Sequence, residues 1–112
     1  MYEFHGDKRR YFDMTHKVTV GHIIPFLQSN WSFPADMRVL EIGCGEAGVL
    51  KAFTDLGFQC TGIELEESRL EFAREFMQAE LAEGKVQFLN KDIYDVVPES
   101  DLGTRFDLII LK

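Results

Sequence analysis

The chain contains the stretch Val39-Leu40-Glu41-Ile42-Gly43-Cys44-Gly45-Glu46-Ala47-Gly48, in which a short apolar run meets three glycines. Residues 37–42 are apolar and β-branched enough for a strand, and a helix is expected over residues 46–56, with Gly57 just past its end. Between the two, the glycines match the pattern G-x-G-x-x-G. Glycine lets the backbone turn tightly, and the free N–H groups of a helix N-terminus attract polar ligand groups. The stretch therefore predicts a ligand-binding strand-to-helix turn.

Strand and helix patterns continue to alternate after this turn. Residues 58–65, 85–89 and 106–111 are predicted strands, and residues 67–83 form an amphipathic helical pattern that Gly84 ends. This alternation is typical of a parallel sheet with helical crossovers. We predict an α/β fold: a Rossmann-like parallel sheet with helices on both faces, truncated after the fourth strand and preceded by N-terminal helices.

The segment before the first strand is expected to be helical. Asp7 is a suitable cap, and we predict two helical pieces that are broken near Thr19-Val20-Gly21 or at Pro25. We therefore divide the chain into an N-terminal helical cap segment, residues 1–36, and the first part of a ligand-binding domain, residues 37–112. Because the chain stops directly after an apolar strand, we expect it to be part of a longer protein.

Composition excludes several classes of function. The chain has 12 Lys and Arg against 19 Asp and Glu, a net charge of −7, so we expect no nucleic-acid partner. No apolar run approaches the roughly 18 residues of a membrane span, and no secretory signal pattern is present; we expect a cytoplasmic protein with no membrane partner. Neither cysteine has a C-x-x-C companion and the three histidines lack ligand spacing, which predicts reduced thiols and no metal site.

Acidic residues surround the predicted turn. Glu64 follows the second predicted strand, where a carboxylate can bind both ribose hydroxyls of an adenosine cofactor. Glu41 and Glu46 add two carboxylates where a dinucleotide places its phosphates, and such repulsion costs on the order of several kcal/mol in a desolvated crevice. S-adenosylmethionine, which has no phosphate and carries an ammonium and a sulfonium, suits this charge better. The alternative interpretation of Glu41 is a strand residue that faces solvent.

Four segments, in order, resemble the class I S-adenosylmethionine-dependent methyltransferases. Residues 39–48 resemble the family's first motif, residues 61–65 its second-strand segment, residues 90–93 the segment after strand three, and residues 106–110 its fourth strand. The resemblance implies that residues 37–112 are the N-terminal half of a cofactor-binding methyltransferase domain. The cofactor-binding residues that we predict are Glu41, Gly43, Cys44, Gly45, Glu64, Leu65, Asp92 and Ile93.

Each of these residues has an expected role. By the resemblance, Glu64 holds the ribose, Asp92 reaches the adenine amino group, and Leu65 and Ile93 flank the ring. Cys44 contributes its backbone and small size, because an acidic turn does not activate a thiol. The alternatives are core packing for Leu65 and Ile93 and turn formation for Asp92.

The expected function is methyl transfer from S-adenosylmethionine to a small-molecule acceptor. The chain supplies the cofactor half-site and is expected to be inactive alone, because in the resembled family acceptor-binding and acid–base residues come largely after strand four; we assign no catalytic residue. One alternative is a nicotinamide-dinucleotide-binding oxidoreductase domain, which also uses G-x-G-x-x-G and a late acidic residue. Another is a non-catalytic fragment that self-associates through its open fourth strand.

Overall fold

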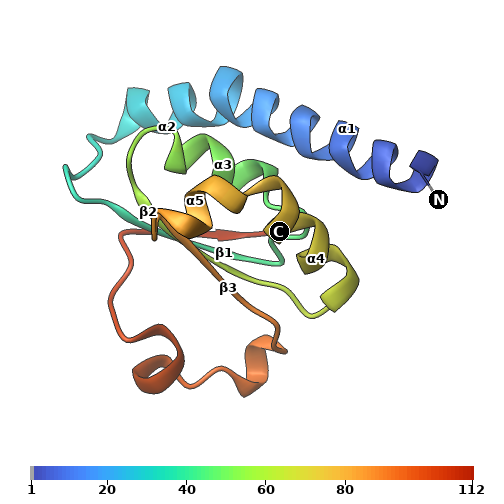
Figure 1. Cartoon of the computed structure of the whole chain (residues 1–112). Helices are drawn as coiled ribbons and strands as arrows, with labels where there is room; N and C mark the ends of the chain where they lie inside the picture. Colours follow the sequence, from blue (N-terminus) through green and yellow to red (C-terminus); the bar gives the residue numbers. More distant parts are fainter. Residues whose placement is uncertain (1) are drawn as a thin grey trace.

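A parallel sheet organises the molecule (Figure 1). The computed structural model describes residues 2–112, with side chains from residue 5 onward. Within this range the sheet has four strands in the order β3-β2-β1-β4, and all three strand pairs are parallel. The strands are β1 (Arg38–Ile42), β2 (Gln59–Ile63), β3 (Val86–Leu89) and β4 (Leu108–Leu111). The predicted parallel α/β fold is confirmed.

The α-helices that connect the strands lie on one face of the sheet, and the β3–β4 connection crosses the other face (Figure 1). The connecting α-helices are α3 (Gly48–Thr54), α4 (Glu67–Phe76) and α5 (Gln78–Ala82). The β3–β4 connection contains only the short helical turns η2 (Ile93–Asp95) and η3 (Pro98–Leu102). One face of the sheet is therefore thickly covered, whereas the other is lightly covered.

Two details of the predicted helices are wrong. The helix expected from residue 46 begins at Gly48, because Ala47 takes a left-handed conformation with φ 77°. The single helix expected over residues 67–83 divides at Met77, whose φ of −114° and ψ of 27° leave the helical region. Met77 is fully buried, so its side chain fills the core at the point where the helix bends.

The N-terminal segment forms one long helical rod. It consists of α1 (Tyr2–Val18), the π-helical turn η1 (Thr19–Ile23) and α2 (Ile24–Asn30), with helical dihedral angles at both junctions. The predicted break into two pieces is wrong, although the irregularity lies where it was expected. Asp7 lies inside α1 and does not cap it. Pro25 is in the first turn of α2, where its ring removes no hydrogen bond that α2 itself needs.

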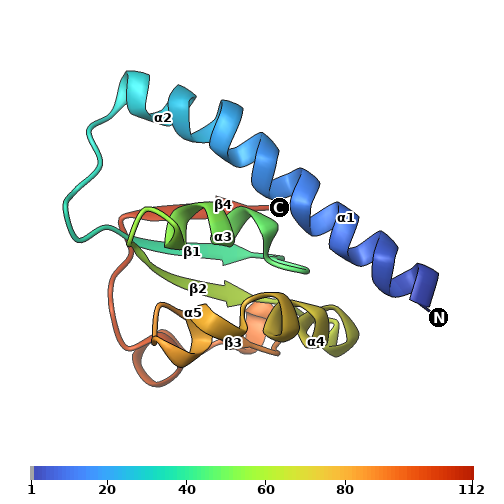
Figure 2. The same ribbon diagram turned by 45° about the horizontal axis from the view of Figure 1, so that its top comes forward.

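The α1 helix packs directly on α3, above the sheet (Figure 2). Gly48 makes this approach possible, since a Cβ on this residue would collide with Thr15 Oγ1 and with the Phe12 carbonyl oxygen. Beneath α3, the core is formed by fully buried apolar side chains that include Met37, Val39, Leu50, Phe53 and Leu70. The third glycine of the turn therefore sets the distance between two helices.

We predict that Gly48→Ala lowers the free energy of unfolding by about 1–3 kcal/mol, because the added methyl group forces α1 away from α3. Gly21→Ala is the matched control: a Cβ there meets nothing within 4 Å, so the substitution should be neutral or stabilising. Urea denaturation of the two variants measures the difference. Equal stabilities would contradict the packing role of Gly48.

Candidate functional site

Backbone hydrogen bonds tie the glycine turn to the end of β2. The N–H groups of Gly43 and Cys44 both donate to the Ile63 carbonyl oxygen, at 2.8 and 3.1 Å. The Glu64 carboxylate accepts from Gly45 N at 2.8 Å and from Glu66 N at 3.1 Å. Gly43 and Gly45 have φ values of 80° and 56°, which favour glycine. The turn is thus held at the carboxyl ends of β1 and β2, two neighbouring strands of the sheet.

A pocket of about 170 Å³ opens beside this turn, at the carboxyl ends of the strands. Five of the eight predicted residues line it: Gly43, Glu64, Leu65, Asp92 and Ile93. Leu65 and Ile93 are 65% and 41% exposed, which argues against core packing as their role. Asp92 does form a turn, because its Oδ1 accepts from Tyr94 N at 2.9 Å, yet it also faces the pocket. Three separate chain segments, which follow β1, β2 and β3, therefore converge on one crevice.

Glu41, in β1 two residues before Gly43, is fully buried and does not line this crevice. Neither of its carboxylate oxygens has a hydrogen-bond partner, and the nearest cation, Lys112 Nζ, is 3.9 Å from Oε2. Burial raises the pKa of Glu41 to about 8, against the opposing effect of Lys112. The alternative interpretation of Glu41 as a solvent-facing residue is wrong. An uncompensated carboxyl group at this position suits a cationic ligand group.

The remaining two predicted residues support the turn from within. Cys44 is fully buried, and burial raises the pKa of its thiol far above the usual value, so it is no nucleophile. The N–H group of Gly45 is turned toward Glu64. These positions shape the turn through their backbone and do not line the pocket.

Glu46 does not add free negative charge to the turn, contrary to the expectation. Arg69 donates to it from Nη2 at 2.9 Å and from Nε at 3.2 Å, and Lys8 Nζ lies 2.9 Å from Oε2. Burial opposes its ionisation, but the hydrogen bonds from Arg69 and Lys8 outweigh burial and lower the pKa of Glu46 to about 2. Sequence reasoning missed Arg69, because no local pattern links α4 to the turn.

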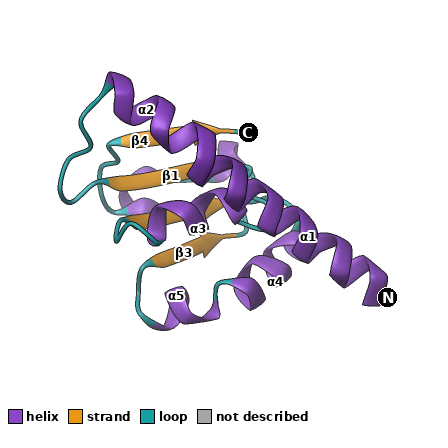
Figure 3. Cartoon of the chain, turned by 90° about the horizontal axis from the view of Figure 1, so that it is seen from above, coloured by secondary structure: helices purple, strands orange, loops and turns teal. Residues whose placement is uncertain are grey.

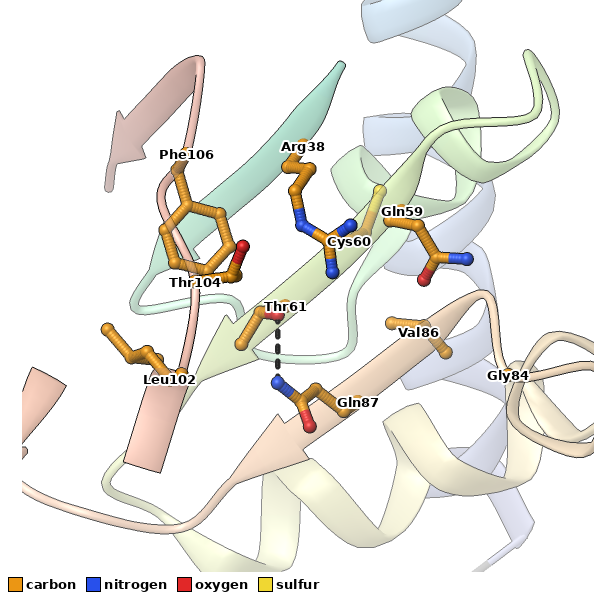
Figure 4. Close-up of a pocket in the computed structure, with 11 residues that line it drawn as sticks. Arg38, Gln59, Cys60, Thr61, Gly84, Val86, Gln87, Leu102, Thr104 and Phe106 are labelled. Carbon is orange, nitrogen blue, oxygen red and sulfur yellow. Dashed lines mark hydrogen bonds between the residues drawn. The ribbon is translucent and has the colours of Figure 1, made fainter. Parts of the chain in front are cut away.

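A polar pocket of about 290 Å³ lies at the opposite, amino-terminal edge of the sheet (Figure 4). Arg38, Thr61 and Gln87 belong to its lining, and Gln87 Nε2 donates to Thr61 Oγ1 at 3.2 Å. Ligands of open parallel sheets bind outside the carboxyl ends of the strands. The smaller crevice beside Gly43 is therefore the candidate cofactor site.

Neither a metal-binding cluster nor a membrane-spanning helix occurs among the described residues. Between residues 2 and 112, no cluster of three or more His, Cys, Asp or Glu side chains is placed to hold a metal ion. In the same part of the chain, none of the helices has the length and apolar character needed to cross a bilayer.

Comparison with known proteins identifies the family. Residues 34–112 match the family described as "Methyltransferase domain", and the chain belongs to this family. No curated protein matches the chain.

Solved structures share the fold. The magnesium protoporphyrin IX methyltransferase ChlM from Synechocystis PCC 6803, solved with bound S-adenosylmethionine, aligns with a TM-score of 0.65 at 21% identity, over 88% of this chain and 44% of that one. The plantazolicin methyltransferase BpumL, in complex with a monoazolic desmethyl analogue and S-adenosylhomocysteine, aligns with a TM-score of 0.67 at 18% identity, over 98% and 40%. The glycopeptide N-methyltransferase MtfA, complexed with S-adenosylmethionine, aligns with a TM-score of 0.63 at 22% identity, over 83% and 39%. The chain thus spans less than half of each structure.

Replacing Glu41 and replacing Glu46 by glutamine are predicted to change the free energy of unfolding in opposite directions. Between pH 4.5 and 8 the folded protein keeps a proton on Glu41 that the unfolded chain releases, so the free energy of unfolding falls as pH rises through this window, by up to about 1.4 kcal/mol per unit. Glu41→Gln should therefore be more stable than the wild type at pH 8 and nearly equal to it at pH 4.5. Urea denaturation without ligand, from pH 4.5 to 9, measures this.

Glu46→Gln is the matched control for that experiment. This substitution removes the carboxylate that forms ion pairs with Arg69 and Lys8, so it should destabilise the protein at pH 7 by about 1–3 kcal/mol. If both variants lose stability at pH 8, Glu41 has a partner that the structure does not show.

Proposed function

We propose that the chain binds S-adenosylmethionine in the crevice beside Gly43 and forms the cofactor half-site of a methyltransferase with a small-molecule acceptor. The observation that carries this proposal is Glu41, a fully buried carboxyl group in β1, two residues before Gly43, that has no hydrogen-bond partner. Such a group is costly unless a ligand compensates it. S-adenosylmethionine carries an ammonium and a sulfonium, and these positive charges can compensate the buried carboxyl group.

The crevice suits the adenosine part of the cofactor. Glu64 lines it at the end of β2 and is available to ribose hydroxyls through the lone pairs that Gly45 and Glu66 do not use. Leu65 and Ile93 present exposed apolar surface for a flat purine, and Asp92, which lines the same crevice, can accept a hydrogen bond from an exocyclic amine. In this assignment Gly43, Cys44 and Gly45 let the backbone pass close to the cofactor.

When bound, S-adenosylmethionine supplies an electrophilic methyl group on a sulfonium. The residues of this chain orient the cofactor and exclude water, which is the main protein contribution to an in-line displacement. No residue in the described part of the chain is assigned as a general base. The chain spans less than half of the solved methyltransferases, and we propose that catalysis needs further segments of the full-length protein.

The wider assignments are also proposals. We propose residues 1–36 as a helical cap over the site and residues 37–112 as the first half of the domain; the family match begins at residue 34, close to this division. A small-molecule acceptor is consistent with the net charge of −7. Cys44 and Cys60 are unpaired thiols, which supports a reducing compartment such as the cytoplasm.

Self-association through β4 is a second proposal, supported by the exposure of this edge strand. Ile109 and Leu111 are 58% and 79% exposed, and one side of β4 pairs with no other strand among the described residues. A second copy of the chain has room to pair along it. Sedimentation velocity separates a monomer from such a dimer.

A thermal-shift comparison tests the proposed function against the dinucleotide alternative. S-adenosylhomocysteine should raise the melting temperature of the full-length protein, whereas NAD should not, because its pyrophosphate would find the N–H groups of Gly43, Cys44 and Gly45 already occupied. A shift with NAD alone would contradict the proposal.

Glu64→Ala should weaken S-adenosylhomocysteine binding by about 1–3 kcal/mol, since charge-assisted hydrogen bonds to the ribose are lost. Titration calorimetry measures the dissociation constant. Glu66→Ala is the control: this side chain is exposed, and its backbone N–H, which donates to Glu64, is retained. An unchanged constant for Glu64→Ala would remove this residue from the site.

A further inference from the structure

The polar pocket at the amino-terminal edge of the sheet is separate from the candidate cofactor site. Its base is formed by residues of β1, β2 and β3, and its other wall by Leu102, Gly103, Thr104 and Phe106 of the β3–β4 connection. Figure 3 shows β3 and β4 at opposite edges of the sheet, and no residue of β4 lines the pocket. The described chain therefore builds this pocket away from the open edge of β4.

The strand register places four polar side chains on the pocket's face of the sheet. Arg38 pairs with Gln59, and Thr61 pairs with Gln87. Because Gln59 and Thr61 are two residues apart in β2, all four side chains point to the same face. Cys60, which lies between them, points to the opposite face and contacts α3. Figure 4 shows the four polar side chains around the pocket.

Two of these side chains have hydrogen-bond donors that the described chain leaves unused. Thr61 is only 5% exposed; its hydroxyl accepts from Gln87 Nε2 at 3.2 Å, but it donates to none of residues 5–112. The Arg38 guanidinium forms no hydrogen bond or ion pair within the same residues. Because buried polar groups are normally satisfied, these donors indicate a site for a hydrogen-bond acceptor.

The charge of the pocket indicates which acceptor fits. Arg38 is the one charged residue among those that line it. A planar guanidinium offers parallel N–H donors that match the two oxygens of a carboxylate. The single positive charge balances one carboxylate, whereas a phosphate dianion would leave excess negative charge close to Asp107, whose Oδ2 accepts from Arg38 N at 2.9 Å. The pocket therefore favours a singly charged anion.

We propose that this pocket binds a small hydroxylated carboxylic acid. The carboxylate pairs with Arg38 and accepts from the Thr61 hydroxyl, and the amides of Gln59 and Gln87 bind the hydroxyl groups of the ligand. A cavity of about 150 Å³ holds one benzene ring, so a pocket of about 290 Å³ suits a ligand of roughly twelve non-hydrogen atoms. This site goes beyond the proposed function, since it shares no lining residue with the cofactor crevice.

Titration of the full-length protein with gluconate, followed by proton–nitrogen NMR, tests the site. The Nε–H signal of Arg38 and the side-chain amide signals of Gln59 and Gln87 should shift and reach saturation. Sorbitol is the matched control ligand, because it has a hydroxymethyl group where gluconate has its carboxylate. It should bind at least tenfold more weakly, since it cannot form the charge-assisted pair with Arg38.

Two arginine variants test the role of the guanidinium. Arg38→Gln should weaken gluconate binding at least tenfold, and it should fold normally because Arg38 is exposed and keeps its backbone bond to Asp107. Arg105→Gln is the matched control: it removes the same charge from an exposed residue that does not line the pocket, and it should change gluconate binding less than twofold. Both variants should bind S-adenosylhomocysteine like the wild type.

The outcomes separate this site from the cofactor site. Equal gluconate affinities of the two variants, or equal affinities of the wild type for gluconate and sorbitol, would overturn the proposal. Inorganic phosphate binding more tightly than gluconate would overturn the assignment to a carboxylic acid. Unmoved Arg38 signals would mean that another part of the full-length chain occupies the pocket, which also overturns the proposal. Failure of S-adenosylhomocysteine to bind would overturn only the proposed function.

Discussion

The hydrogen bonds between the glycine turn and the end of β2 are the constraint on which the site depends. The N–H groups of Gly43, Cys44 and Gly45 all donate inward, two to the Ile63 carbonyl and one to the Glu64 carboxylate. In dinucleotide-binding folds the corresponding turn lies against a pyrophosphate. Here the turn has already used these donors, and in doing so it fixes the carboxylate proposed to hold the ribose. The same bonds that shape the turn therefore favour a cofactor without phosphate.

The two buried glutamates near this turn differ in how the protein accommodates a buried carboxyl group. Glu46 receives Arg69 from α4 and Lys8 from α1, so its carboxylate is ionised and structural. Glu41 receives no hydrogen bond, and its burial raises its pKa to about 8. Because folded proteins seldom keep such a group unpaired, Glu41 is better explained by a ligand than by the fold. Glu46 thus stabilises the turn, whereas Glu41 is the residue proposed to interact with the ligand.

Local patterns predicted the strands, since a strand depends on residues close in sequence. The crevice joins residues far apart in sequence, and Leu65, Asp92 and Ile93 were predicted to lie there with Glu64 from the resemblance to class I methyltransferases, which agrees with the meeting of parallel strand ends at one sheet edge. The pairing of Glu46 was not predictable, because Arg69 and Lys8 come from separate helices and no periodicity records their meeting. The bend at Met77 depends likewise on tertiary packing, which overrides helix propensity.

The glycine turn also fixes the position of the N-terminal helix α1. Lys8 reaches Glu46, while Thr15 and the Phe12 carbonyl contact Gly48, so the residues that shape the turn also fix where α1 lies. Gly48 therefore differs in role from Gly43 and Gly45, because it sets the packing of α1 on α3, whereas the positive φ values of the other two shape the backbone of the turn. A site held by rigid elements loses less conformational freedom on binding than one formed by loops.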